Sequence, residues 1–408
     1  MDEAMAEHTI ERIDGGITAP GGFEAAGVTC GIKSTGRDLA LLVSRPPAHA
    51  AAIFTTNLAV AAPLVVTREH LQRAGSLVSA LVVNSGCANA CTGERGLATA
   101  RGMATDTANA LGCPEEQVLV SSTGVIGVQL DGERLRRGIT LAASALGREG
   151  HRAAAEAIMT TDPWPKEAAV RVTTPAGVFH VGGMAKGAGM IEPNMATMLG
   201  FLTTDAAGEP ALLRRALVQA AENTFNAITV DGETSTNDMV VLLAGGRSGV
   251  RIDEAGYPAF VDALHAVCRE LALGVVRGGE GATKLIEITV SGARSPAEAK
   301  QAARAIANSP LVKTAVHGGD PNWGRLVAVA GRAGVGFDLA HARVRIGEAE
   351  LFGDEEIFAD REPAAAEHLR GSEVAVGVDM GTGGAGTATV WTCDFSAEYV
   401  HINADYRT

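Results

Sequence analysis

One threonine near the middle of the 408-residue chain lies where it could act as a nucleophile. Thr197 follows Ala196 in a stretch, residues 182–205, that is rich in glycine and methionine. A threonine hydroxyl is a weak nucleophile unless a nearby group accepts its proton. If the chain were cut between Ala196 and Thr197, the freed α-amine of Thr197 would be that base, because an α-amine has a pKa of about 7.7–8.0. The alternative is a buried segment that contains a threonine by chance.

Other arrangements of nucleophile and base are hard to build from this sequence. The ten histidines are scattered, no Gly-x-Ser-x-Gly motif is present, and His180, the histidine nearest to Thr197, lies in a predicted strand. Of the six cysteines only Cys87 and Cys91 are close together, and no second cluster at zinc-site spacing accompanies them. We therefore expect no metal site and no disulfide framework.

Polar residues that could stabilise a reaction intermediate follow a predicted strand. Residues 79–86 and 117–127 are apolar runs that end in polar turns, and helical patterns follow at 93–111 and 131–146. This alternation of strand, loop and helix indicates an α/β protein. In the second turn the backbone N–H groups near Thr123 and Gly124 could face a developing oxyanion, although an ordinary turn explains the same pattern.

The rest of the chain continues the alternation of strands and helices. Gly278–Gly281 is a natural boundary before a second lobe, whose strand at 282–290 alternates strictly between apolar and polar residues. Residues 381–386 match Gly-x-Gly-x-x-Gly, but a strand follows instead of a helix, so we expect a hairpin loop and no dinucleotide site. Further elements are expected at 153–159, 210–225, 257–273 and 296–308 (helices) and at 170–181, 239–244 and 311–316 (strands).

Composition and charge exclude several classes of protein. The net charge of −13 leaves no basic stripe for nucleic acid, and the acidic N-terminus is unlike a signal peptide. No apolar run approaches the roughly 18 residues of a membrane-spanning helix. The 50 glycines imply many tight turns. We therefore expect a cytoplasmic protein that binds neither nucleic acid nor membranes.

The run from Gly189 to Leu199, GMIEPNMATML, closely resembles the autocleavage signature of the ornithine acetyltransferase family, also called glutamate N-acetyltransferases. One departure is Glu192, where many members have His, and this difference bears on the rate of cleavage. Other stretches resemble the same family in the same order: residues 123–127, 159–162, 185–187, 226–232, 279–284, 318–325 and 402–408.

The resemblance implies a fold and a processed chain. The expected fold class is α/β, with two α/β lobes and mixed sheets of the ornithine acetyltransferase type. Autoproteolysis between Ala196 and Thr197 would leave an α chain of residues 1–196 and a β chain of residues 197–408, with a second lobe from about residue 280. The two chains would stay associated, as an (αβ)2 heterotetramer.

The resemblance also implies residue roles. Thr197 would take the acetyl group from N2-acetyl-L-ornithine as an ester, and L-glutamate would remove it in a ping-pong cycle of arginine biosynthesis. Thr123 and Gly124 would form the oxyanion hole. Substrate binding would involve Lys186 at the α-carboxylate and Glu280 at the δ-ammonium of ornithine. Further binding positions are Asn403, Thr408, Thr197 itself, and Thr160 or Thr161.

Two other functions remain open from the sequence. An N-terminal-nucleophile amidohydrolase would use the same threonine with water as the acceptor. A non-catalytic protein could use the glycine-rich loops to bind a nucleotide or another small ligand. No cofactor is expected, and the sequence leaves open whether acetyl-CoA also serves as an acetyl donor.

Overall fold

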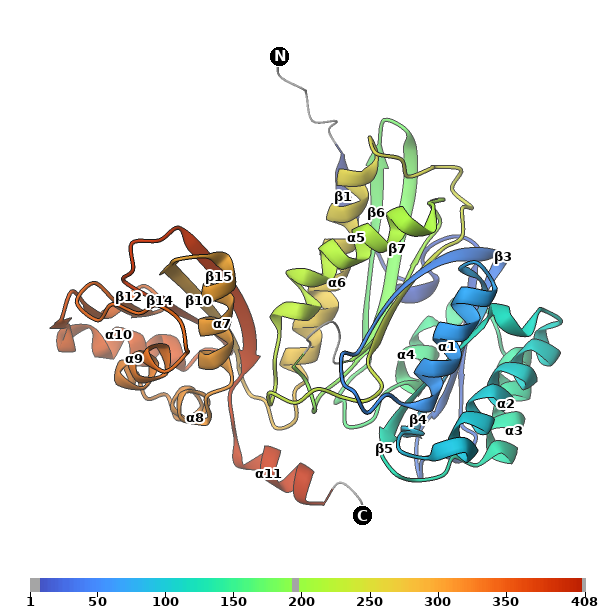
Figure 1. The fold of residues 1–408 in the computed structure, drawn as a ribbon, viewed down its shortest axis with the longest axis horizontal. Helices are drawn as coiled ribbons and strands as arrows, with labels where there is room; N and C mark the ends of the chain where they lie inside the picture. Colours follow the sequence, from blue (N-terminus) through green and yellow to red (C-terminus); the bar gives the residue numbers. More distant parts are fainter. Residues whose placement is uncertain (1–7, 193–197, 406–408) are drawn as a thin grey trace. The chain divides into compact units, whose positions relative to one another are not determined.

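The computed structural model describes residues 8–192 and 198–405, which form two compact units (Figure 1). Within these ranges, unit 1 comprises residues 8–187, 198–226 and 234–275. Unit 2 comprises residues 188–192, 227–233 and 276–405. The predicted cleavage residues Ala196 and Thr197, and the predicted binding residue Thr408, lie outside the described residues.

Unit 1 is built on a mixed sheet of nine strands among the residues described. Two neighbouring pairs, β4 with β5 and β8 with β9, are parallel, and the other pairs are antiparallel. The strand order is β1 (Thr9–Arg12), β6 (Lys166–Thr174), β7 (Gly177–Lys186), β8 (Leu199–Thr204), β9 (Met239–Ala244), β3 (Leu39–Phe54), β4 (Leu77–Cys87) and β5 (Val118–Val125), with β2 (Phe23–Val28) paired to β3.

Helices cover both faces of this sheet, which explains why its central strands read as continuous apolar runs. Along β4, Val82 belongs to a core cluster with Met103 of α2, whereas its neighbours Leu81 and Val83 belong to a second cluster with Ala154 of α4. Successive side chains of a strand point to opposite faces, so both faces are buried here. The helices of this part are α1 (Ala62–Arg73), α2 (Gly93–Leu111), α3 (Gly132–Ser144), α4 (His151–Ala157), α5 (Pro210–Glu222) and α6 (Tyr257–Arg277).

Unit 2 is built on a second mixed sheet. Its central strand β10 (Leu285–Ala293) lies between β14 (Glu373–Asp379), to which it is parallel, and β15 (Gly386–Cys393), to which it is antiparallel. The order continues from β14 through β11 (Arg343–Ile346) and β12 (Ala349–Gly353) to β13 (Glu356–Ile357). The helices are α7 (Pro296–Ala307), α8 (Pro310–Gly318), α9 (Trp323–Gly331), α10 (Glu362–Leu369) and α11 (Ala397–Ala404).

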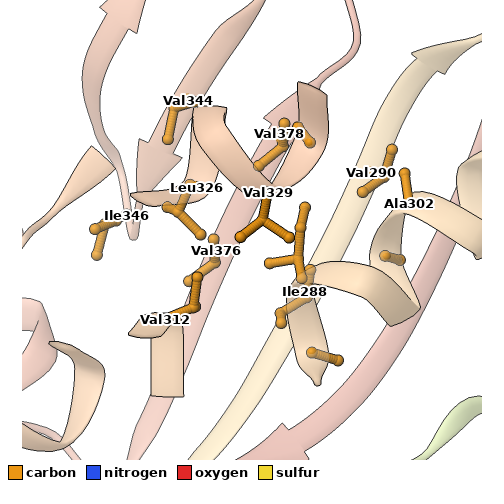
Figure 2. Packing of buried hydrophobic residues seen from close by; sticks show 14 of the residues in the cluster. Ile288, Val290, Ala302, Val312, Leu326, Val329, Val344, Ile346, Val376 and Val378 are labelled. Atoms are coloured by element: carbon orange, nitrogen blue, oxygen red, sulfur yellow. The ribbon is translucent and has the colours of Figure 1, made fainter. Parts of the chain in front are cut away.

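The core of unit 2 follows from the alternation along β10. Ile286, Ile288 and Val290 are all fully buried, and the residues between them face away from this core. Figure 2 shows Ile288 and Val290 near Ala302 of α7 and Val329 of α9. The helices that share this core therefore lie on the face of the sheet to which Ile286, Ile288 and Val290 point.

Short 3-10 turns complete the secondary structure: η1 (Gly16–Thr18), η2 (Glu115–Gln117), η3 (Arg148–Gly150), η4 (Phe225–Ala227) and η5 (Ala359–Arg361). Among the described residues, no helix combines the length and the apolarity needed to cross a membrane.

The structure confirms the α/β class with mixed sheets and most of the predicted elements. The helix predicted at 296–308 is α7, and the side chain of Ser295 accepts the N–H of Glu298 at its start, as its N-cap position requires. The strand pair predicted at 170–181 is the hairpin of β6 and β7, which pairs Thr174 with Gly177 at its turn.

Two predictions in unit 2 are wrong. Residues 311–316 are not a strand but lie in α8, because Ser309 caps the helix at the N–H of Val312 and Pro310 occupies its first position. Residues 381–386 are not a hairpin loop, because the strands on either side, β14 and β15, do not pair with each other. They flank β10, so this glycine-rich segment connects two strands across a third.

Candidate active site

In unit 1, the predicted oxyanion residues lie where two parallel strands end together. Ser85 of β4 is paired with Thr123 of β5, and Gly86 with Gly124. Gly124 has a φ of +128°, and a side chain there would collide with the backbone at Gly86. Only glycine fits this conformation and this close approach, so the local geometry requires a glycine at position 124.

Lys186 is bonded to two other predicted site residues, Thr160 and Thr123. It is the last residue of β7, its side chain is buried, and its Nζ donates to Thr160 Oγ1 at 2.8 Å and to Thr123 Oγ1 at 3.3 Å. Both partners are neutral hydroxyls. Thr161 is half-buried and adds no hydrogen bond to this cluster among the residues that the structure describes. The structure thus places Thr160, and not Thr161, against Lys186.

A buried carboxylate that the sequence analysis gave no role supports this cluster. Asp162 accepts Lys166 Nζ at 2.5 Å, the N–H of Gly187 at 2.7 Å and the N–H of Thr160 at 3.0 Å. Burial alone would raise the pKa of the Asp162 carboxyl, but the charges of Lys166 and Lys186 outweigh burial and lower this pKa to about 2. Asp162 therefore stays ionised and fixes the backbone on both sides of the site, at Thr160 and after Lys186.

A second lysine near the cluster also had no predicted role. Lys33 is half-buried, and its Nζ donates to the carbonyl of Met159 at 2.9 Å. Burial lowers the pKa of Lys33, and the nearby charge of Lys186 acts in the same direction, against the carboxylates of Asp38 and Asp162. Lys33 lies in what reads as an ordinary turn between two strands, so nothing in the sequence indicated that it would lie near the site.

Asp238 is a further buried carboxyl group in unit 1. It directly precedes β9, whose first N–H, at Met239, donates to the carbonyl of Met198 at 3.1 Å. Ser235 hydrogen-bonds to the Asp238 carboxyl, while Oδ2 has no hydrogen-bond partner within the described part of the chain. Burial raises the pKa of Asp238 well above its usual range. The Asp238 carboxyl therefore gives up its proton less readily than an exposed aspartic acid.

In unit 2, the predicted binding residues Glu280 and Asn403 are in direct contact. Glu280 is 6% exposed and lies in the connection between α6 and β10. Asn403, in α11, donates its side-chain amide to Glu280 Oε2 at 2.7 Å. The N–H of Glu280 donates to the carbonyl of Ala188 at 2.8 Å. The structure therefore brings together two residues that are far apart in sequence.

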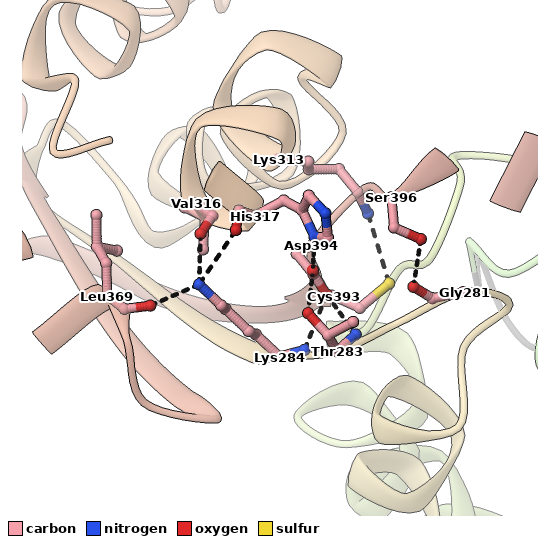
Figure 3. Close-up of polar contacts among 10 residues, drawn as sticks. All are labelled: Gly281, Thr283, Lys284, Lys313, Val316, His317, Leu369, Cys393, Asp394 and Ser396. Carbon is pink, nitrogen blue, oxygen red and sulfur yellow. Dashed lines mark hydrogen bonds and ion pairs between the residues drawn. The ribbon is translucent and has the colours of Figure 1, made fainter. Parts of the chain in front are cut away.

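The residues after Glu280 are anchored by side chains of unit 2 (Figure 3). Ser396 donates to the carbonyl of Gly281 at 2.6 Å. The buried carboxylate of Asp394 accepts the N–H groups of Thr283 and Lys284 at 2.7 and 2.8 Å and pairs with His317 Nδ1 at 2.6 Å. Burial alone would raise the pKa of Asp394, but hydrogen bonds from Thr283 and His317 outweigh it and lower the pKa. These bonds hold the loop that carries Glu280.

Residues 188–192, which we call the strap, belong to unit 2 although they directly follow β7 of unit 1. Asp231 accepts the N–H groups of Met190 and Ile191 at 2.7 and 2.8 Å, one at each carboxylate oxygen. Glu192, the departure from the family pattern, pairs with Arg304 at 3.5 Å and accepts hydrogen bonds from Thr229 and Asn308. A carboxylate therefore fits this position because a cation and two donors surround it.

No group of three or more His, Cys, Asp or Glu residues within residues 8–192 and 198–405 is arranged to hold a metal ion. The six cysteines are all free thiols in the structure.

Comparisons with known proteins give a consistent result. A family model with the description ArgJ family matches residues 24–408. The chain is 51% identical, over 98% of its length and 100% of the relative, to the arginine biosynthesis bifunctional protein ArgJ of Symbiobacterium thermophilum. It is 42% identical, over 99% of both chains, to the protein of the same name from Bacillus subtilis. Among solved structures it is similar to ornithine acetyltransferase from Mycobacterium tuberculosis in complex with ornithine, with 39% identity and a TM-score of 0.43 over 46% of this chain and 100% of that chain.

Proposed function

The chain belongs to the ArgJ family, and from this membership we propose that it transfers the acetyl group of N2-acetyl-L-ornithine to L-glutamate in arginine biosynthesis. The products are L-ornithine and N-acetyl-L-glutamate. The chain is a glutamate N-acetyltransferase that first cuts itself between Ala196 and Thr197. The α chain, residues 1–196, and the β chain, residues 197–408, then remain associated.

The reaction runs in two acyl transfers through Thr197. The Thr197 hydroxyl attacks the acetyl carbonyl of acetylornithine, its α-amine accepts the hydroxyl proton, and the C–N bond breaks to release ornithine with that proton on its amine. The neutral amine of glutamate then attacks the acetyl ester, the ester C–O bond breaks, and the proton lost by that amine passes through the α-amine of Thr197 to restore its hydroxyl. Thr123 and Gly124 hold the oxyanion of both tetrahedral intermediates. Every step uses groups of the protein and its substrates, so the cycle requires no cofactor.

The observation that carries this proposal is the cluster of Lys186 and Thr123, which are buried, with Thr160, which is half-buried, beside the turn at Gly124. The hydrogen bonds of Lys186 within the described residues go to neutral hydroxyls, so its charge is available for the α-carboxylate that both amino acid substrates carry. Thr160, which shares the Lys186 ammonium, is the threonine of the pair 160–161 that we assign to substrate binding.

The side-chain group of the substrate is assigned to Glu280 by family resemblance. The Glu280 carboxylate suits the δ-ammonium of ornithine. The Asn403 amide, which now donates to Glu280, offers the donor that the side-chain carboxylate of glutamate needs. Thr408 completes this set by family resemblance.

The proposal is tested by processing and turnover together. A denaturing gel of purified protein should show two chains, of 196 and 408 − 196 = 212 residues, and N-terminal sequencing of the second should begin Thr-Met-Leu-Gly. The Thr197→Ala variant should stay uncut and inactive, with Thr203→Ala in β8 as a matched control that is still cut. An intact, active wild-type chain would contradict the scheme.

Two rival functions, an amidohydrolase and a ligand-binding protein, are distinguished by further assays. With acetylornithine as donor, release of acetate at the same rate with and without glutamate would indicate an amidohydrolase. Stabilisation of the protein by ATP or NAD, but not by acetylornithine, would instead favour a ligand-binding protein. Because the relatives are called bifunctional, we also propose acetyl-CoA as a second donor, tested by acetylation of glutamate without acetylornithine.

The proposal also covers the cellular location of the enzyme and its oligomeric assembly. We place the enzyme in the cytoplasm, where its amino acid substrates are made, and assign it an (αβ)2 assembly. Light scattering of the processed protein measures the mass, and a mass of one αβ pair would exclude that assembly.

A further inference from the structure

Asp231 is hydrogen-bonded to two structural elements that touch the Glu280 carboxylate. One element is the strap, whose Gly189 packs so closely under Glu280 that a side chain there would collide with the carboxylate. The other is helix α11, whose Asn403 donates to Glu280 Oε2 at 2.7 Å. Each element is therefore in contact with the group that we assign to the side-chain end of the substrate.

Asp231 is bonded to both of these elements. It binds the strap through the N–H groups of Met190 and Ile191, at 2.7 and 2.8 Å, and it accepts the hydroxyl of Tyr399 in α11 at 3.3 Å. Tyr399 and Asn403 are one helical turn apart, and Asn403 also donates to the carbonyl of Tyr399 at 3.0 Å. A shift of Tyr399 is therefore passed to the amide that holds Glu280.

The surroundings keep this connection rigid. The carbonyl of Ile191 accepts the N–H of Val230 at 2.7 Å, so the strap is hydrogen-bonded to the residue that directly precedes Asp231. Burial, and the carboxylates of Asp231 and Glu280, raise the pKa of Tyr399, so its hydroxyl remains a donor at neutral pH. Asp231 itself is half-buried and faces no substrate group in this assignment.

We propose that Asp231 is a positioning residue for substrate recognition, which acts through the strap and α11 to fix the Glu280 carboxylate. The inference rests on the proposed function, because it takes Glu280 as a substrate-binding group. Asp231 does not take part in the acyl transfer. Its loss should weaken the binding of acetylornithine and glutamate more than it slows the chemical step.

The variant Asp231→Asn tests this directly. In either orientation the amide nitrogen faces a strap N–H, because each carboxylate oxygen accepts one, and donor then opposes donor. We expect the KM of the processed enzyme for both substrates to rise about tenfold, with kcat changed by less than about twofold. Tyr399→Phe removes only the bond to α11 and should raise KM about twofold. Asp338→Asn is the matched control, since Asp338 also accepts a backbone N–H in unit 2, that of Ala340, and should leave both constants unchanged.

A double-mutant cycle with Glu280→Gln separates positioning from general loosening of the fold. If Asp231 acts through Glu280, Asp231→Asn should raise KM by less than about twofold in the Glu280→Gln background. An unchanged KM in Asp231→Asn, or a tenfold rise that persists without the Glu280 carboxylate, would overturn the inference. The proposed function fails by a different result, namely a wild-type enzyme that transfers no acetyl group to glutamate.

Discussion

The surroundings of Lys186 in unit 1 and of Glu280 in unit 2 hold a charged side chain by different means. Lys186 is bonded to side chains, two hydroxyls, in a buried cluster that also contains the ion pair of Asp162 and Lys166. Glu280 is bonded to one amide, and its position depends on backbone groups of the strap and on a terminal helix.

The difference determines how each region should respond to substitution. Buried charges interact strongly and leave a large penalty when one partner is removed. A carboxylate positioned by several backbone contacts loses only part of its support when any one of them is lost. Single substitutions should therefore have large effects in unit 1 and graded effects in unit 2.

The largest effect is expected for Asp162→Asn, which leaves the buried ammonium of Lys166 without its partner. At pH 7 the free energy of unfolding should fall by about 3–5 kcal/mol. Because the folded-state pKa of Asp162 lies below the unfolded value, its contribution is present above about pH 4 and is lost as the pH falls through about 2. Urea unfolding at several pH values measures this free energy. The control is the surface ion pair of Asp106 and Arg136, where Asp106→Asn should lower the free energy of unfolding by less than about 1 kcal/mol.

A smaller effect is expected for Lys186→Met, which removes the charge assigned to the substrate carboxylate but keeps the apolar stem. We expect kcat/KM to fall about 100-fold, as for the loss of one partner of a buried charge pair. The measurement is steady-state transfer from acetylornithine to glutamate by the processed enzyme. A loss below tenfold would mean that Lys186 supports Thr123 and Thr160 instead of the substrate.

Glu280→Gln should have a weaker effect, because the amide still fits between the strap and Asn403. We expect KM for acetylornithine to rise about tenfold, equivalent to about 1.4 kcal/mol. If Glu280→Gln proves as damaging as Lys186→Met, the contrast between the two regions is wrong.

The smallest effect is expected for Asp238→Asn, and its sign is opposite to that of Asp162→Asn. Because the folded-state pKa of Asp238 is raised, its contribution to stability is present below about pH 4 and is lost as the pH rises toward that folded value. Asparagine does not ionise, so the Asp238→Asn variant should not lose stability as the pH rises. Its free energy of unfolding should exceed that of the wild type by about 1 kcal/mol at pH 8 and nearly equal it at pH 4. Thermal unfolding at both pH values decides the sign.

Much of the fold was readable from the sequence, because burial repeats with the period of each element. The alternation of Ile286, Ile288 and Val290 predicts β10, and Ser295 with Pro296 predicts the start of α7. The prediction failed where apolar runs were short. Residues 311–316 fit a buried strand as well as a helix, and the cap at Ser309 decided for the helix.

The sequence by itself determined the family and the candidate residues, because the family's motifs and their order along the chain can be recognised without any knowledge of contacts. It named Lys186, Glu280 and one of Thr160 and Thr161, and it placed the proposed nucleophile at Thr197. The supporting residues Asp162 and Asp231 stood within the same motifs, and Asp238 lay six residues after one of them. A carboxylate in a loop looks the same in sequence whether it faces water or a buried lysine.

Only the tertiary structure decided what those carboxylates do. The pKa of Asp162 is lowered because Lys166 and Lys186 lie beside it, and the pKa of Asp238 is raised because burial outweighs the charges and hydrogen bonds around it. Asp231 can connect two elements because it is hydrogen-bonded to Met190, 41 residues before it in the sequence, and to Tyr399, 168 residues after it. Charge state and connection depend on neighbours that are distant in sequence, and the fold alone brings these together.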